Sequence, residues 1–186
     1  MGFHLILWFF MFSRVFLLII LSFPLFNCSI HSQNCSPGWK ITGFYTPLET
    51  DYKSSKRTLV DIEQNGKTLL NSEFVEKVMI EGWGKTTQNW YLGFYSGNWH
   101  KSEQPLNSLG QPLSIGQVAV DTNNIPKGSL ISIPSIQGAF KNIEFIAVDV
   151  GSAIIDQHID IYTGEGEQAK YKTWNVTGIH QVCIKG

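Results

Sequence analysis

Short apolar runs separated by turn residues dominate the second half of the chain. They are rich in β-branched and aromatic residues, and they end at Gly, Pro, Asn or Asp. Runs of this length and composition are typical of buried strands. They lie at residues 117–121, 129–133, 144–150, 159–162 and 181–184. Residues 168–172 predict a single helical turn.

The first half of the chain predicts three further strands, at residues 39–45, 78–84 and 90–95. Residues 49–77 are the most polar part. Within them, residues 71–77 predict a short helix that begins at an N-cap formed by Asn71 or Ser72. Many short strands with few helices favour a barrel over a layered α/β fold.

An apolar segment opens the chain. Residues 15–26 have the length of a signal-peptide core and are shorter than the ~20 residues that cross a bilayer. The alternative is one longer anchor helix that contains Arg14, which would place a costly charge inside the membrane. We therefore expect residues 1–28 to be a signal peptide and the protein to be exported.

Three cysteines fit an exported protein. Cys28 follows the apolar core, and residues 25–28 are similar to a bacterial lipobox with unusually bulky residues before the cysteine. Cys28 is thus a candidate for lipidation, or it is removed with the signal. Cys35 and Cys183 then remain as a disulfide candidate, which would stabilise the fold by roughly 4–5 kcal/mol. The alternative is that Cys183 is a buried thiol.

Composition narrows the function classes. The net charge is −1 and no basic run occurs, so nothing predicts a nucleic-acid partner. The histidines and cysteines show no metal-ligand spacing, and we expect no cofactor. The mature chain has the size of a single domain, and its 17 glycines, 7 prolines and 13% aromatic residues suit a β-rich one.

Aspartates interrupt or end three of the apolar runs: Asp121, Asp149 and Asp160. Burying a carboxylate is costly unless it is paired or hydrogen-bonded, so such residues mark structural networks or acid–base chemistry. Asp160 alternates with two isoleucines, and an apolar setting would raise the pKa of its carboxyl group toward that of a general acid. The alternative is a carboxylate bound by turn amides.

The other polar residues have structural alternatives as well. Asp149 would equally cap the turn at Gly151, and an Asx turn accounts fully for Asp121. His158 is expected to be a solvated loop residue rather than the partner of a carboxylate. Five aromatic residues are candidates for stacking on sugars, of which we expect one or two in a cleft: Trp83, Trp90, Tyr91, Tyr95 and Trp99.

Four blocks of the sequence, in order, resemble a known family. Residues 149–154 (Asp-Val-Gly-Ser-Ala-Ile) and 158–164 (His-Ile-Asp-Ile-Tyr-Thr-Gly) resemble the C-terminal signature of the membrane-bound lytic transglycosylase A family. Asp121 with residues 125–128 resembles the first motif of the three-aspartate (3D) domain. Residues 41–47 (Ile-Thr-Gly-Phe-Tyr-Thr-Pro) resemble the opening of the transglycosylase.

This resemblance implies a fold and a set of roles. The fold is a six-stranded, all-β, double-psi barrel over residues 36–186. Asp160 is the implied catalytic acid and base, and the supporting or substrate-binding candidates are Asp149, Asp121, Tyr45 and Trp83. The family has glycine where Ser152 stands and Lys-Gly at residues 155–156. The stretch between Tyr45 and Asp121 leaves no room for the family's second domain, so a shallow cleft is expected.

The predicted function is that of a peptidoglycan lytic transglycosylase. It would cleave the β-1,4 bond between N-acetylmuramic acid and N-acetylglucosamine and leave a 1,6-anhydromuramyl product. The alternative is a non-catalytic glycan-binding barrel, and an inverting hydrolase with two aspartates is a third interpretation. We expect a monomer in the periplasm or at the outer membrane, whose partner is the peptidoglycan glycan strand and which contacts membrane only through a lipid on Cys28.

Overall fold

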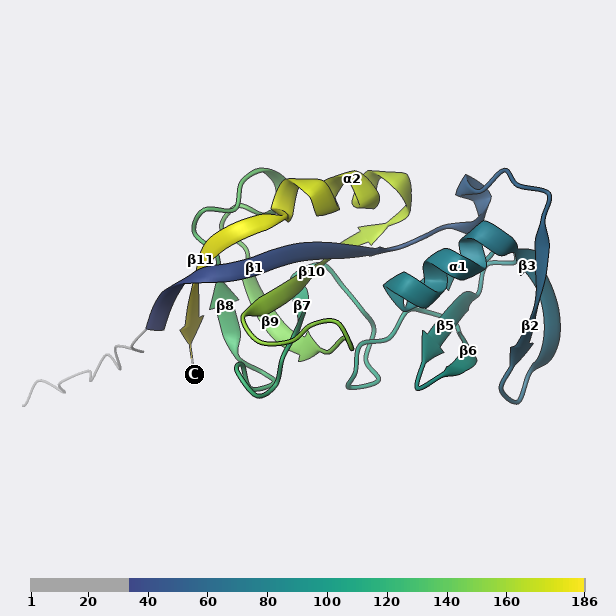
Figure 1. Cartoon of the computed structure of the whole chain (residues 1–186), viewed down its shortest axis with the longest axis horizontal. Coiled ribbons are helices and arrows are strands. Elements are labelled where there is room, and N and C mark those ends of the chain that lie inside the picture. The colour runs from purple at the N-terminus through teal and green to yellow at the C-terminus, as the bar shows by residue number, and fades with distance from the viewer. Residues whose placement is uncertain (1–33, 186) are drawn as a thin grey trace, which may run out of the picture. The chain divides into compact units, whose positions relative to one another are not determined.

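The computed structural model describes residues 34–185, in which six strands close into a barrel (Figure 1). These strands are β1 (Asn34–Thr46), β7 (Gln117–Val120), β8 (Leu130–Ser132), β9 (Glu144–Asp149), β10 (His158–Glu165) and β11 (Gly178–Lys185). Their order around the barrel is β1-β10-β7-β9-β8-β11. The pairs β1–β10 and β7–β9 are parallel, and the other four are antiparallel. The predicted six-stranded double-psi barrel is confirmed.

Alternating apolar residues of these strands fill the barrel interior. The largest fully buried side chains there include Phe145, Ile41, Ile131, Ile159 and Ile161. On β10, the two isoleucines point inward, so the residues between and beside them face the other way. Because of this alternation, the side chain of Asp160 points to the outside of the barrel.

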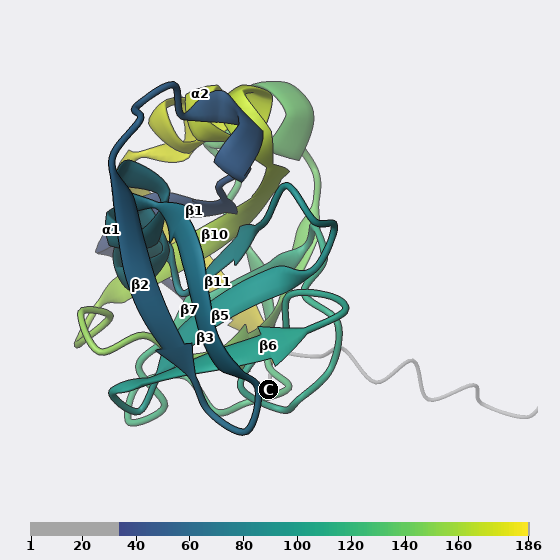
Figure 2. The ribbon, with the colours of Figure 1, turned by 90° about the vertical axis from the view of Figure 1, so that its right-hand side faces the viewer.

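A second sheet lies between Tyr45 and Asp121. We expected no room for a second domain in this segment, and that prediction is wrong. Its five strands lie in the order β3-β2-β6-β5-β4. They are β2 (Arg57–Ile62), β3 (Gly66–Asn71), β4 (Trp83–Lys85), β5 (Tyr91–Tyr95) and β6 (Asn98–Ser102). Figure 2 shows β2, β3, β5 and β6 from the side of this sheet. Short strands suffice because one helix and one sheet face share a small core of their own.

That helix is α1 (Ser72–Glu81). The side chain of Asn71 accepts hydrogen bonds from the backbone N–H groups of Glu73 and Phe74, as the predicted N-cap requires. Gly82 ends the helix with a positive φ of 85°. The helix is longer than predicted, and the strand predicted at residues 78–84 is confined to β4, because Val78 packs on the helix side of this core.

A second helix, α2 (Gly166–Val176), replaces the predicted single turn and lies across β1 and β10 (Figure 1). Gly43 permits this packing, because a Cβ atom there would lie 2.8 Å from the Cα atom of Thr173. At the other end of β1, Cys35 and Cys183 are directly paired across β1 and β11 and joined by a disulfide that closes a loop of 148 residues. The chain-entropy model gives such a loop about 5 kcal/mol of stabilisation.

The predicted signal peptide and Cys28 lie outside the described residues. Two short 3₁₀ helices, η1 (Glu49–Asp51) and η2 (Gly138–Phe140), complete the elements of the described part. In residues 34–185, no helix combines the length and the apolar character needed to cross a bilayer.

Candidate active site

Strand register brings Asp149 and Asp160 to one place on the barrel wall. Asp160 pairs with Thr42 on β1 and with Ala119 on β7. Ala119 in turn pairs with Asp149 on β9. Four neighbouring strands therefore carry the row Thr42, Asp160, Ala119, Asp149. The small side chain of Ala119 leaves open space between the two carboxylates.

Asp160 is mostly buried and is held by one short hydrogen bond. The hydroxyl of Thr42 lies 2.6 Å from its Oδ1 atom. Burial raises the pKa of the carboxyl group to about 6, and the negative charges of Glu81 and Asp149 act in the same direction. The bond from Thr42 and the charge of Lys40 oppose the increase. A substantial fraction of Asp160 is consequently protonated at mildly acidic pH, as a general acid requires.

His158 belongs to the same site, and its prediction as a solvated loop residue is wrong. It opens β10 and is only 8% exposed. Its Nε2 atom lies 2.8 Å from the hydroxyl oxygen of Thr42. Burial and the nearby charge of Lys40 lower the pKa of the imidazole, while a hydrogen bond with the Ala153 backbone opposes this. The period of two along β10 places His158 and Asp160 on the same face.

Asp149 connects the barrel to the loop at residues 106–110. Its Oδ1 atom accepts hydrogen bonds from the backbone N–H groups of Ser108 and Val150, both at 2.9 Å. Lys127 donates to the hydroxyl of Ser108 at 2.8 Å. Burial raises the pKa of Asp149, and these hydrogen bonds oppose the increase. Asp149 thus holds the loop and also faces the site.

Asp121 lies in the loop that follows β7. It accepts hydrogen bonds from the backbone of Asn123 and of Asp156 and from the side chain of Asn124. The backbone bonds lower the pKa of its carboxyl group. This is the arrangement of an Asx turn, extended by a bond to the loop that precedes β10.

A groove of about 680 Å³ runs over Asp149 and Asp160. The barrel contributes Phe44, Ala119, the two aspartates and the loop at residues 150–154. The opposite wall is made by the end of α1 and by the second sheet, including Trp83, Phe94, Tyr95 and Ser96. The segment at residues 106–110 completes the lining. The groove therefore has two walls, one from the barrel and one from α1 and the second sheet.

Glu81 is a third carboxylate in the groove, which sequence reasoning missed. Its side chain is only 10% exposed and forms an ion pair with Lys77 at 2.7 Å. It also accepts the backbone N–H of Tyr45 at 3.1 Å. The one signal in the sequence is the i, i+4 spacing from Lys77, which is common on helix surfaces and does not single out a site.

The predicted aromatic residues divide between the groove and the packing around it. Trp83 and Tyr95 line the groove, and the indole N–H of Trp83 donates to the carbonyl of Leu106 at 2.9 Å. Tyr45 is buried and is absent from the groove lining, as are Trp90, Tyr91 and Trp99. The backbone N–H of Tyr45 donates to Glu81, and its ring lies 5.5 Å from the Nζ atom of Lys77, the ion-pair partner of Glu81.

Two positions depart from the pattern of the family, with different structural results. Asp156 stands where the pattern has glycine and takes the left-handed φ of 58° that glycine would favour. Aspartate tolerates this conformation better than most residues. Ser152 also replaces a glycine, but it is not among the described residues with positive φ. The turn before β10 therefore forms without glycine at either position.

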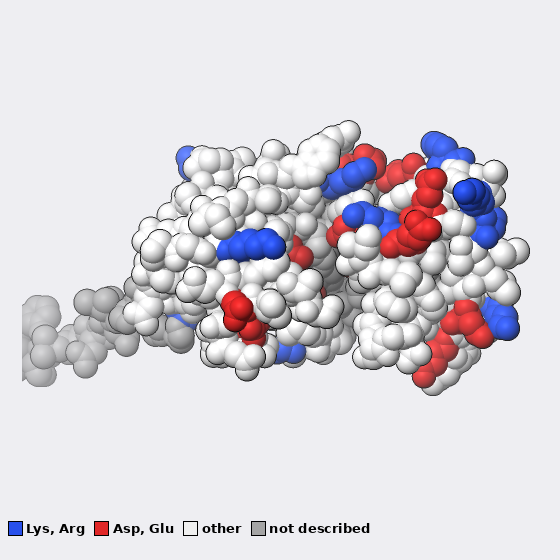
Figure 3. All heavy atoms as spheres, in the orientation of Figure 1, with Lys and Arg blue, Asp and Glu red and all other residues white. Residues whose placement is uncertain are grey.

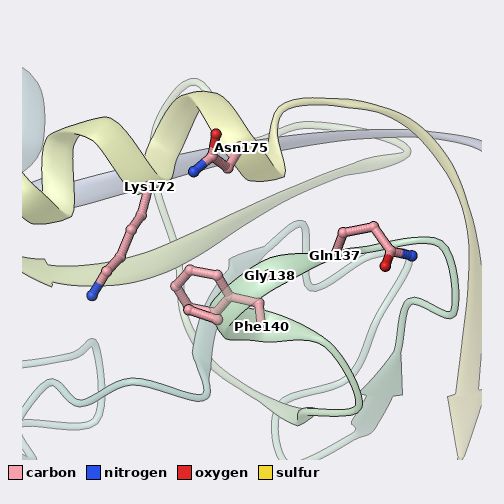
Figure 4. Close-up of a pocket in the computed structure, with 6 residues that line it drawn as sticks. Gln137, Gly138, Phe140, Lys172 and Asn175 are labelled. Carbon is pink, nitrogen blue, oxygen red and sulfur yellow. The ribbon is translucent and has the colours of Figure 1, made fainter.

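A smaller cavity of about 280 Å³ lies between η2 and α2 (Figure 4). Its lining includes the ring of Phe140 and the side chains of Gln137, Lys172 and Asn175. The lining holds no carboxylate or imidazole. Across residues 34–185, no three His, Cys, Asp or Glu side chains are grouped so that they could hold a metal ion. On the face in Figure 3, basic and acidic side chains are interspersed without a continuous patch of one sign.

Comparisons with known proteins agree with this geometry. The sequence model of the 3D domain matches residues 116–180. The structure is similar to Escherichia coli MltA with bound chitohexaose (TM-score 0.61, 14% identity, covering 80% of this chain and 71% of that one). It is also similar to the membrane-bound lytic murein transglycosylase of Agrobacterium tumefaciens (TM-score 0.57, 14% identity, 82% and 75%). A further match is MltA of Neisseria gonorrhoeae (TM-score 0.53, 12% identity, 81% and 72%).

No curated protein sequence matches the chain. The structural matches cover 80–82% of the chain, far more than the residues that the domain model matches. Residues 116–180 therefore match the 3D domain, and the chain has the fold of the MltA lytic transglycosylases.

Proposed function

We propose that this protein is a lytic transglycosylase that cleaves peptidoglycan glycan strands, with Asp160 as its acid and base. The observation that carries the proposal is the carboxyl group of Asp160, whose pKa burial raises to about 6 and which lines a two-walled groove. A carboxyl group in this state gives up a proton readily and takes one back, as both halves of the reaction require.

The reaction proceeds in two proton transfers through this one residue. Protonated Asp160 gives its proton to the glycosidic oxygen, and the bond from that oxygen to the muramyl anomeric carbon breaks. The resulting carboxylate then takes the proton of the muramyl 6-hydroxyl. At the same time, the oxygen of this hydroxyl bonds to the anomeric carbon. The products are a 1,6-anhydromuramyl end and a free 4-hydroxyl, and Asp160 is protonated again. Because no water attacks, the reaction needs no second carboxylate as a base.

The groove suits a chain of uncharged sugars. Its volume of about 680 Å³ is in the range of pockets that hold several rings. The exposed ring of Tyr95 offers an apolar face to pyranoses, and the nearly buried ring of Trp83 packs against it. Asn107 and Ser108 add polar groups to the lining. The similar E. coli protein holds chitohexaose, an oligomer of N-acetylglucosamine, and we extend that ligand class to this groove.

The remaining site residues have supporting roles in this proposal. Asp149 holds the loop at residues 106–110 and raises the proton affinity of Asp160. Trp83 supports the groove wall, because its ring packs against Tyr95 and its indole N–H holds the carbonyl of Leu106. Asp121 acts through the turn before β10, and Tyr45 acts through Glu81, so neither contacts the substrate.

A periplasmic or outer-membrane location fits this substrate. Export would depend on residues 1–28, and lipidation of Cys28 would anchor an otherwise monomeric protein. Intact-mass analysis of the protein from the membrane fraction tests the anchor, because a diacyl or triacyl group on Cys28 adds a defined mass. A soluble product that begins after Cys28 would exclude the anchor and leave export in place.

Mass spectrometry of digested peptidoglycan tests the activity. Purified sacculi incubated with the protein should release fragments with 1,6-anhydromuramyl ends, which weigh one water less than reducing ends. Reducing ends alone would identify a hydrolase. Tight binding to sacculi without any release would identify a glycan-binding barrel, and either result would overturn the proposed reaction.

A further inference from the structure

One hydroxyl group joins the two titratable side chains on the outer face of β10. Thr42 lies between them on β1, with its Oγ1 atom 2.6 Å from Asp160 Oδ1 and 2.8 Å from His158 Nε2. Both distances are those of hydrogen bonds. The parallel register of β1 and β10 sets this arrangement, because Thr42 pairs with Asp160 while Lys40 pairs with His158.

The single hydrogen of Thr42 makes the two bonds depend on each other. A threonine hydroxyl donates once and accepts through its lone pairs. When Asp160 is a carboxylate, Thr42 donates to it, and His158 Nε2 must carry a hydrogen to donate to Thr42. When Asp160 is protonated at Oδ1, it donates to Thr42, and Thr42 then donates to an unprotonated Nε2. The protonation of Asp160 therefore fixes whether Nε2 of His158 carries a hydrogen.

We propose that Asp160, Thr42 and His158 form a proton relay, in which His158 stores the proton that Asp160 uses. In the transfer, the Asp160 O–H bond breaks and its proton bonds to Thr42 Oγ1, while the Thr42 hydrogen moves to His158 Nε2. The site changes from neutral carboxyl and neutral imidazole to carboxylate and imidazolium. Its net charge and its number of protons stay the same.

Burial moves the proton affinities on the two sides of Thr42 toward each other. Burial raises the pKa of Asp160 to about 6, and burial lowers the pKa of His158 from 6.5. The other charged groups that act on the pair are Lys40 on β1, Glu81 at the end of α1 and Asp149 on β9. The two acidic groups favour a proton in the site, and Lys40 opposes a second one.

The role of the relay in catalysis rests on the proposed transglycosylase reaction, whereas the relay itself can be measured without substrate. His158 would be a positioning residue, because it acts on the substrate only through Thr42 and Asp160. It would return a proton to Asp160 whenever the carboxyl group loses one to solvent between reaction cycles.

Nuclear magnetic resonance of the imidazole nitrogens of His158 and the Cγ carbon of Asp160 tests the relay. Coupled groups titrate as a pair, so in the wild type both nuclei should show the same two steps, separated by about one pH unit or more. Thr42→Val removes the hydroxyl and should leave one independent step at each nucleus. Thr42→Ser keeps the hydroxyl and should restore both steps.

The chain supplies a matched control in His180, whose Nδ1 lies 2.7 Å from the hydroxyl of Ser135. The imidazole signals of His180 should be the same in all variants at each pH. Asp160→Asn should reduce His158 to one step without affecting His180, and this comparison decides the matter if Thr42→Val fails to fold. A single His158 step in the wild type, with a midpoint that Asp160→Asn leaves unchanged, would overturn the relay. A relay in a protein that releases no anhydro products would refute only the proposed activity.

Discussion

At the scale of single residues, Asp160 is destabilising when charged. The pKa of Asp160 is about 6 in the folded protein, against an ordinary value of 3.8. The folded protein therefore binds this proton more tightly than the unfolded chain does. The unfolded state therefore loses its proton first as the pH rises, and the folded state becomes relatively less stable between pH 4 and pH 6. The difference of about two units corresponds to about 3 kcal/mol above pH 7.

Asp160→Asn should consequently stabilise the protein in a pH-dependent way. The asparagine keeps the shape of the side chain but carries no charge, so the gain should approach 3 kcal/mol above pH 7 and vanish below pH 4. Urea unfolding at several pH values measures it. Asp121→Asn is the control of opposite sign, because the lowered pKa of Asp121 makes its charged form stabilising above pH 4. Equal effects of Asp160→Asn at pH 4 and pH 8 would contradict the raised pKa.

The sequence reveals some of these residues and hides others for physical reasons. Asp160 is recognisable because a carboxylate alternates with isoleucines in one strand. Thr42 is not, since it meets Asp160 across a sequence separation of 118 through the register of a parallel pair. His158 was misjudged for the same reason: its burial comes from neighbouring strands rather than from its own surroundings in the sequence.

At the scale of elements, the strands with one strongly apolar face were predicted, whereas the polar hairpin formed by β2 and β3 was not. The barrel strands carry β-branched runs, and each was placed within a few residues. The buried apolar residues of β2 and β3 are Val60, Ile62 and Leu70, whereas Leu59 and Leu69 are more than half exposed. Such strands form because they pair with each other and cover α1, so their sequence alone carries little periodic signal.

Close contact between β1 and α2 depends on Gly43. A methyl group there would press on the backbone of Thr173, which cannot turn aside as a side chain would. Gly43→Ala should destabilise the fold by about 1–3 kcal/mol, the cost of overpacking. Chemical denaturation measures the loss. Ile179→Ala on the neighbouring β11 is the control, since Ile179 is 70% exposed and its truncation should change stability by less than about 0.5 kcal/mol. Equal stability of Gly43→Ala and wild type would refute the close packing.

At the scale of the whole molecule, the groove exists because the barrel and the second sheet each supply a wall. The blocks that resemble the transglycosylase family lie in the barrel, so the resemblance correctly indicated the barrel and Asp160's strand. It gave no information about residues 57–102, which form the opposite wall. The second sheet is small, and it needs few apolar residues because α1 covers one of its faces. The segment is therefore long enough for it, contrary to our expectation.

Tyr95 should bind sugar from that opposite wall. Its ring is 47% exposed, lines the groove and stacks on His100 with a centroid distance of 3.6 Å, which fixes its orientation. Tyr95→Ala should weaken binding of chitohexaose about tenfold, as the loss of one aromatic contact predicts. Calorimetric titration with Asp160→Asn protein, which binds without cleaving, measures the affinity. Tyr171→Ala on α2 removes an exposed tyrosine that does not line the groove and should leave it unchanged. A wild-type affinity in Tyr95→Ala would exclude this wall from the binding site.

The most direct test of the central claim is the rate at which Asp160→Asn releases anhydromuropeptides from sacculi. If Asp160 is the single acid and base, the rate should fall by about two to four powers of ten, while binding to sacculi stays near that of the wild type. Asp121→Asn should release product within a few-fold of the wild-type rate, because Asp121 lies outside the groove. A folded Asp160→Asn protein that releases anhydromuropeptides as fast as the wild type would contradict the account.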